Sequence, residues 1–78
     1  MHNLAGSPGE VAQSLEAANA AANHGKGSGV CRAVISELRR NDVQGARAIA
    51  SLDFDKVRQY PELAGLFLQS GLVSAKLR

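Results

Sequence analysis

Residues 30–38, "VCRAVISEL", contain the clearest structural pattern in the chain. The apolar residues of this run recur with a period of about 3.6 residues, so they form one broad stripe along a helix. These residues are Val30, Cys31, Val34, Ile35 and Leu38. Ser28 just before the run is a preferred N-cap residue, and the cations of Arg39 and Arg40 suit the helix C-terminus. The stretch therefore predicts a helix with one buried face, which neighbouring helices have to cover.

Two further principal helices and a short connecting helix are expected on the C-terminal side of this run. Asp42 predicts the N-cap of the first, whose expected buried residues are Val43, Ala46, Ile49 and Ala50. A short connecting helix carries Phe54 and Val57. Pro61 disfavours the α conformation at the residue before it, so the last helix is expected to start there and to run to Ser70, where Gly71 ends it.

On the N-terminal side, the sequence predicts an alanine-rich helix from Pro8 to Asn23. Ser7 and Glu10 form a capping-box pattern, and proline is favoured at the first helical position. The stretch "NHGKGSGV" (residues 23–30) then contains several glycines, which are typical of a flexible connection. We therefore expect residues 1–29 to form a tail, an alanine-rich helix and a glycine-rich joint, and residues 30–78 to form a compact helical domain.

No segment shows the strict alternation of a β-strand. The predicted fold class is all-α: a small bundle of three principal helices, with a short connecting helix and the alanine-rich N-terminal helix. The chain has 78 residues and one cysteine, Cys31, which excludes an internal disulfide framework and indicates a reducing compartment. Because neither a membrane-spanning run nor a secretory signal is recognisable, we expect a cytoplasmic protein that does not enter a membrane.

The sequence contains no pattern typical of an enzyme. "HGKGSG" departs from a phosphate-binding loop, since Ala20 stands at the first glycine of that motif and Gly27 follows Lys26 in place of serine or threonine. A mobile joint is the favoured interpretation, and an anion held by the following helix N-terminus with Lys26 is the alternative. His2, His24 and Cys31 match no zinc spacing. We expect no catalytic residue, no metal, no cofactor and no small-molecule substrate.

The last helix and the residues after it are apolar nearly all round. The residues concerned are Leu63, Leu66, Phe67, Leu68, Leu72 and Val73. A helix of this kind is buried on most sides, and exposed contiguous apolar area marks an interaction site. We therefore predict a non-enzymatic interaction domain that binds a protein partner, or a second copy of itself, through these residues and the "YPEL" corner. The alternative is that the N-terminal helix closes the core alone.

Four arginines form a second candidate site, with Lys26 nearby. They are Arg32, Arg39, Arg40 and Arg47. Nine basic and seven acidic residues give a net charge of +2, which permits an anionic partner without demanding one. The arginines are expected to form the rim of the protein-binding site, or alternatively the phosphate-contacting face of a nucleic-acid-binding module. A third interpretation is a solvated face with local ion pairs such as Glu37 with Arg40.

Residues 55–68, "DKVRQYPELAGLFL", resemble a short helical segment of the form "VRxYPELAxxY" found in multidomain proteins of plasmids and other bacterial mobile elements, including relaxase-associated proteins. The match is carried by Val57, Arg58 and the run "YPELA" at residues 60–64, and Phe67 stands near the usual aromatic position. The resemblance covers about 14 of the 78 residues. It implies a bacterial or mobile-element origin, and it implies no functional residue.

Overall fold

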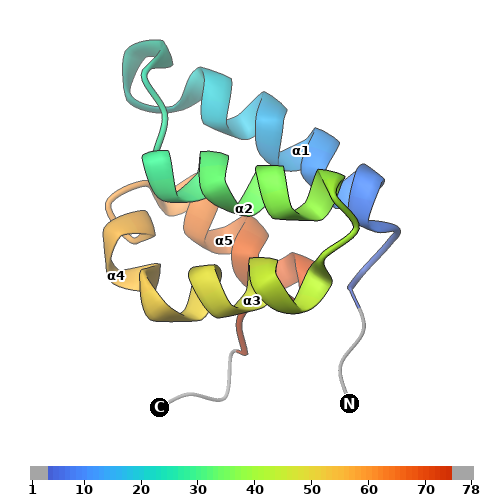
Figure 1. The fold of residues 1–78 in the computed structure, drawn as a ribbon. Coiled ribbons are helices and arrows are strands. Elements are labelled where there is room, and N and C mark those ends of the chain that lie inside the picture. Colours follow the sequence, from blue (N-terminus) through green and yellow to red (C-terminus); the bar gives the residue numbers. More distant parts are fainter. Residues whose placement is uncertain (1–3, 75–78) are drawn as a thin grey trace.

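The computed structural model describes residues 4–74 and shows a small bundle of α-helices (Figure 1). The helices are α1 (Pro8–Ala21), α2 (Gly29–Arg39), α3 (Val43–Leu52), α4 (Phe54–Val57) and α5 (Pro61–Ser70), and a 3₁₀ turn, Ala22–Gly25, follows α1. No β-strand occurs between residues 4 and 74. The predicted all-α fold class is confirmed, and α5 has the predicted bounds, from Pro61 to Ser70.

Helix α2 lies in the middle of the bundle, as its broad apolar stripe requires. It packs against α1 on one side and against α3 on the other, while α5 crosses behind α2 and α3 (Figure 1). The buried apolar residues of all five helices, with two residues just beyond α5, form one core. The core consists of Val11, Ala12, Leu15, Cys31, Val34, Ile35, Leu38, Ala46, Ala50, Val57, Leu63, Phe67, Leu72 and Val73.

Side chains satisfy the free backbone groups at several helix ends. The Ser7 hydroxyl accepts the N–H of Glu10, and the Glu10 carboxylate accepts the N–H of Ser7, so both halves of the capping box form. Asp42 accepts the N–H of Gly45 at 2.9 Å, and this bond is the main cause that lowers the pKa of the Asp42 carboxyl below its usual value. Gly71 ends α5 in the left-handed conformation, with φ of 90°.

The connection between α1 and α2 is a fixed turn, which corrects the expectation of a flexible joint. Asn23 and His24 both adopt left-handed backbone angles, and α1 ends two residues before the predicted Asn23. The buried side chain of Asn19 accepts the backbone N–H of Ser28 at 2.6 Å. Gly27 has φ of +64°, and a Cβ added there would lie 2.6 Å from the Asn19 carbonyl oxygen. The glycine therefore serves close approach of the turn to α1 and not mobility.

The packing of the described residues shows no division at residue 29. Val11, Ala12 and Leu15 of α1 are buried in the same core as the residues of α2 to α5. The Cys31 thiol of α2 lies 4.0 Å from the carbonyl oxygen of Leu15. Alanine side chains bury little area themselves, but their small size lets α1 lie close to α2, so residues 4–74 form one folded unit.

The turn gives the first testable prediction. Gly27→Ala should destabilise the fold by roughly 2 kcal/mol or more, because alanine resists the left-handed conformation and its Cβ collides with Asn19. Gly29→Ala is the matched control, since a Cβ there meets nothing within 4 Å at the first residue of α2, and it should be neutral or slightly stabilising. Urea unfolding measures both; equal stability of the two variants would show that the connection is flexible after all.

Candidate functional site

The structure buries most of the predicted apolar anchor inside the single chain. Leu63, Phe67, Leu72 and Val73 belong to the core, so they are not available to a partner in this structure. The prediction that they form a docking surface is therefore corrected: α1 packs along α5 and helps to close the core, which was the alternative considered for the N-terminal helix. A charged residue substituted for Phe67 would be buried. Its effect would therefore be a loss of fold stability and not a loss of partner binding.

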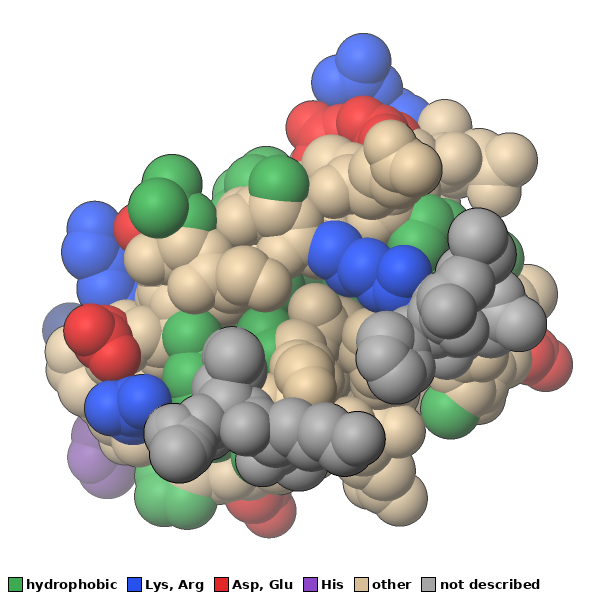
Figure 2. Space-filling view, turned by 90° about the horizontal axis from the view of Figure 1, so that it is seen from below, with side chains coloured by type: hydrophobic (Ala, Val, Ile, Leu, Met, Phe, Trp, Pro, Cys, Tyr) green, Lys and Arg blue, Asp and Glu red, His purple; other side chains and the backbone are tan. Residues whose placement is uncertain are grey.

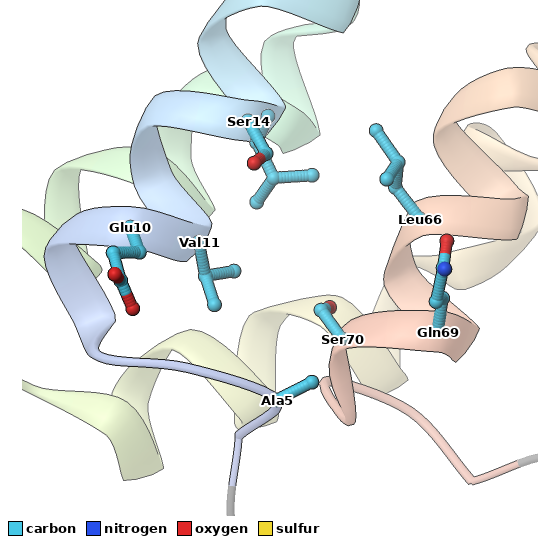
Figure 3. A pocket seen from close by; sticks show the side chains of 8 residues that line it. Ala5, Glu10, Val11, Ser14, Leu66, Gln69 and Ser70 are labelled. Carbon is cyan, nitrogen blue, oxygen red and sulfur yellow. The ribbon is translucent and has the colours of Figure 1, made fainter.

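Two of the predicted anchor residues reach the surface, on different sides of α5. Leu68 is 40% exposed, while Leu66 is partly buried and points toward α1 (Figure 3). Within the described part of the chain, the most exposed large apolar side chain is that of Leu52 at the end of α3, with 84% of its area accessible. Single exposed leucines are ordinary on protein surfaces, so Leu52 and Leu68 by themselves indicate no site.

Leu66 belongs to a groove between α1 and α5. Among residues 4–74, three adjoining hollows follow the seam of the two helices, and the hollow at the end of α5 has a volume of about 240 Å³. Val11 and Ser14 from α1 face Leu66, Gln69 and Ser70 from α5 across this hollow (Figure 3). The residues that line the three hollows define the α1–α5 groove: Ala5, Glu10, Val11, Ser14, Leu15, Ala17, Ala18, Ala21, Ala22, Asn23, Gln59, Tyr60, Pro61, Glu62, Leu66, Gln69 and Ser70.

The groove runs along the whole of α5. Ser14 and Leu66 line both the first and the second hollow, and Glu62 lines both the second and the third, so the hollows adjoin one another. The start of α1 lies beside the end of α5, and the end of α1 lies beside the start of α5, so the two helices are antiparallel. Ala5 holds the N-terminal segment at one end of the groove by donating its N–H to the Ser70 carbonyl oxygen at 2.9 Å.

The arginines of the second candidate site do not form a continuous basic face. Arg39 pairs with Glu16 of α1, and Arg40 pairs with Glu37 one turn earlier on α2. Arg47 is half-buried and donates from Nε to the Gly71 carbonyl oxygen at 3.3 Å, so it ties α3 to the end of α5. Figure 2 shows one face of the molecule, on which basic side chains stand apart from one another and several lie beside acidic ones.

These pairings match the third interpretation of the arginines, a solvated face with local ion pairs. The expected Glu37–Arg40 pair forms, with 3.5 Å between Oε2 and Nη1. Arg58 pairs with Asp55 in the same way and also stacks over the Phe54 ring. Arg32 is exposed on α2. Exposed pairs of this kind contribute less than about 1 kcal/mol each, but they neutralise much of the charge that a phosphate-contacting face would need.

No chemistry-bearing cluster appears in the described part of the chain. Within residues 4–74, no group of three or more His, Cys, Asp or Glu side chains is placed to hold a metal ion, and no helix has the length and apolar character to cross a membrane. Cys31 is fully buried on the inner face of α2, and burial raises the pKa of its thiol to about 11. Such a thiol stays protonated at neutral pH and makes a poor nucleophile. His2 lies outside the described residues.

Comparison with protein-family models, with curated proteins and with solved structures finds no match to this chain. The resemblance of residues 55–68 to a mobile-element segment therefore stays a prediction.

Sequence reasoning missed the α1 side of the groove, because the alanines of that helix indicated only weak packing. The signal that could have found it is a second row of small residues, Ser14, Ala17, Ala18 and Ala21, beside the row of core residues on the same helix.

The buried thiol gives the second prediction. Because the pKa of Cys31 is raised in the folded chain, its contribution to stability is complete below the unfolded pKa of about 8.5 and is lost as the pH rises toward about 11. Relative to Cys31→Ala, the wild-type free energy of unfolding should fall by about 2 kcal/mol between pH 7 and pH 10, as measured by urea unfolding. A pH-independent difference between the two proteins would mean that the thiol titrates normally.

Proposed function

We propose that this protein is a non-enzymatic helical domain that binds a protein partner through the α1–α5 groove. The observation that carries the proposal is the row of three adjoining, mostly apolar hollows between α1 and α5. Concave apolar surfaces with a few polar groups at their edges are the usual sites of binding. The proposal keeps Leu66 from the predicted anchor and the corner formed by Tyr60, Pro61 and Glu62, and it gives up the residues that the core encloses.

The shape of the groove supports an amphipathic helix as the occupant. Both walls are α-helices, whose backbone N–H and C=O groups are bonded within each helix except at the ends. An extended peptide lying here would find few backbone partners and would leave its own polar groups unpaired against an apolar wall. A helix satisfies its own backbone and packs its side chains into the seam of two others, which is the helix-in-groove mode of recognition.

The nucleic-acid alternative receives less support from the surface. Arg39, Arg40 and Arg58 are paired with acidic residues, and Arg47 serves the contact between α3 and α5.

We also propose that the interaction takes place in the cytoplasm of a bacterial cell, on the strength of the single buried, free Cys31 and of the resemblance of residues 55–68.

In-cell cross-linking tests the function directly. A photoreactive phenylalanine replaces Ala17, which lines the groove, or Ala20, which is exposed on the same helix and lines none of the three hollows. We expect position 17 to cross-link to a discrete protein and position 20 to give no such product. Ser14→Arg, a bulky charge at an exposed position of the groove, should remove the product from position 17 without changing the circular dichroism of the chain.

Three results would contradict the proposal. Equal cross-linking from both positions would show that the contacts are non-specific, and no protein product from position 17 would leave the groove without a partner. Cross-linking to nucleic acid, weakened by replacing Arg39 and Arg40 with alanine, would favour the alternative function. A product of twice the mass of the chain would instead identify a second copy as the partner.

A further inference from the structure

Among residues 4–74, the side chains that line the α1–α5 groove include acidic ones and no basic ones. Glu10 lines the hollow at the end of α5, and Glu62 lines both of the hollows toward its start. No lysine or arginine of residues 4–74 lines any of these hollows. The chain as a whole has nine basic and seven acidic residues, so the charge along the groove is opposite in sign to the net charge of the molecule.

The two helix dipoles do not change that sign. Because α1 and α5 are antiparallel along the groove, their macrodipoles oppose each other and leave the local potential to the side chains. Glu62 is exposed and forms no ion pair with another residue of the described chain, so its carboxylate is available to a partner. Glu10 is held in place at the other end, because its Oε1 accepts the Ser7 N–H at 2.9 Å.

We propose that the partner helix is cationic, with two basic residues about two turns apart on the edges of its apolar face. This inference rests on the proposed function of the groove and adds the chemistry of its occupant. Glu62 and Gln69 are separated by seven residues on α5, about 10 Å along the helix axis, and Glu10 lines the same hollow as Gln69. A partner helix in the seam meets the two carboxylates with lysine or arginine at positions i and about i+7.

The pairing also explains how the groove discriminates among amphipathic helices. The apolar lining of the groove can pack against many partner helices whose apolar faces differ in their alanines and leucines. Apolar contact alone therefore gives little selectivity. An acidic helix would place like charges against Glu10 and Glu62, whereas a basic one gains attraction at both ends. The charges therefore set which helices bind and how fast they arrive, and the apolar seam supplies most of the affinity.

Two synthetic peptides test the inference on the full chain. Both are helical, of about 18 residues, with the same alanine and leucine face, and they carry either lysine or glutamate at the two flanking positions. By calorimetric titration in about 50 mM salt, the lysine peptide should bind at least about tenfold more tightly than the glutamate peptide. In about 500 mM salt the ratio should fall below about threefold, because exposed charges are screened.

Charge-reversal variants connect the preference to the groove. Glu62→Lys should abolish or invert the preference for the lysine peptide, since it replaces the available carboxylate. Asp55→Lys changes the net charge by the same amount at an exposed position of α4 outside the groove, and it should leave the preference intact. An equal effect of the two variants would show that only net charge matters and would overturn the inference.

The peptides also separate this inference from the function on which it rests. Equal binding of the two peptides, lost in Ala17→Arg, would overturn the cationic partner and leave the helix-binding groove standing. Failure of both peptides to bind, together with the absence of a cross-link from position 17, would overturn both. Tighter binding of the lysine peptide that Ala17→Arg leaves unchanged would place the charge preference outside the groove and would likewise overturn the inference.

Discussion

Between α1 and α2 the chain reverses direction through left-handed residues, and a buried hydrogen bond from the Ser28 N–H to the Asn19 side chain holds this reversal in place. The Asn19 side chain pairs the N–H of Ser28, which precedes α2 and has no partner within that helix. Without this bond, the N–H would be buried and unpaired. With the turn fixed, α1 has one available orientation, alongside α2 and antiparallel to it. The core of the bundle depends on that orientation, because α1 contributes Val11, Ala12 and Leu15.

The same constraint produces both the burial and the groove. Once α1 lies beside α2, it also packs against α5, and its buried residues join the core that contains Leu63 and Phe67. The contact of α1 with α5 is the looser one, since the middle of the surface between them has the small side chains of Ser14, Ala17 and Ala18 on α1 and one large apolar side chain, Leu66, on α5. Small residues cannot fill the seam of two helices, and an open groove is the result.

The charged residues have mostly structural partners. Arg39 joins α2 to α1 through Glu16, and Arg47 joins α3 to the end of α5 through the Gly71 carbonyl. Each of these contacts spans two elements that the core already brings together, so it adds orientation more than stability. The groove, by contrast, has two carboxylates, those of Glu10 and Glu62, that form no ion pair within residues 4–74.

The sequence by itself determined the helices, because their signals are local. A 3.6-residue period, a serine or aspartate cap and a glycine or proline stop act within a few residues of chain, and Ser7, Ser28, Asp42 and Gly71 all behave as their types predict. These signals, together with the lack of any strand-like alternation in the sequence, predicted the all-α class.

Only the tertiary structure decided what covers the last helix. Phe67 lies in a core shared by all five helices, and α1 joins that core because of the direction in which the chain reverses after it. That direction is set by Asn19 and Ser28, nine residues apart, together with a glycine that must lie against a carbonyl oxygen. Composition cannot distinguish a glycine needed for close packing from one that gives mobility, since both require the absence of a side chain.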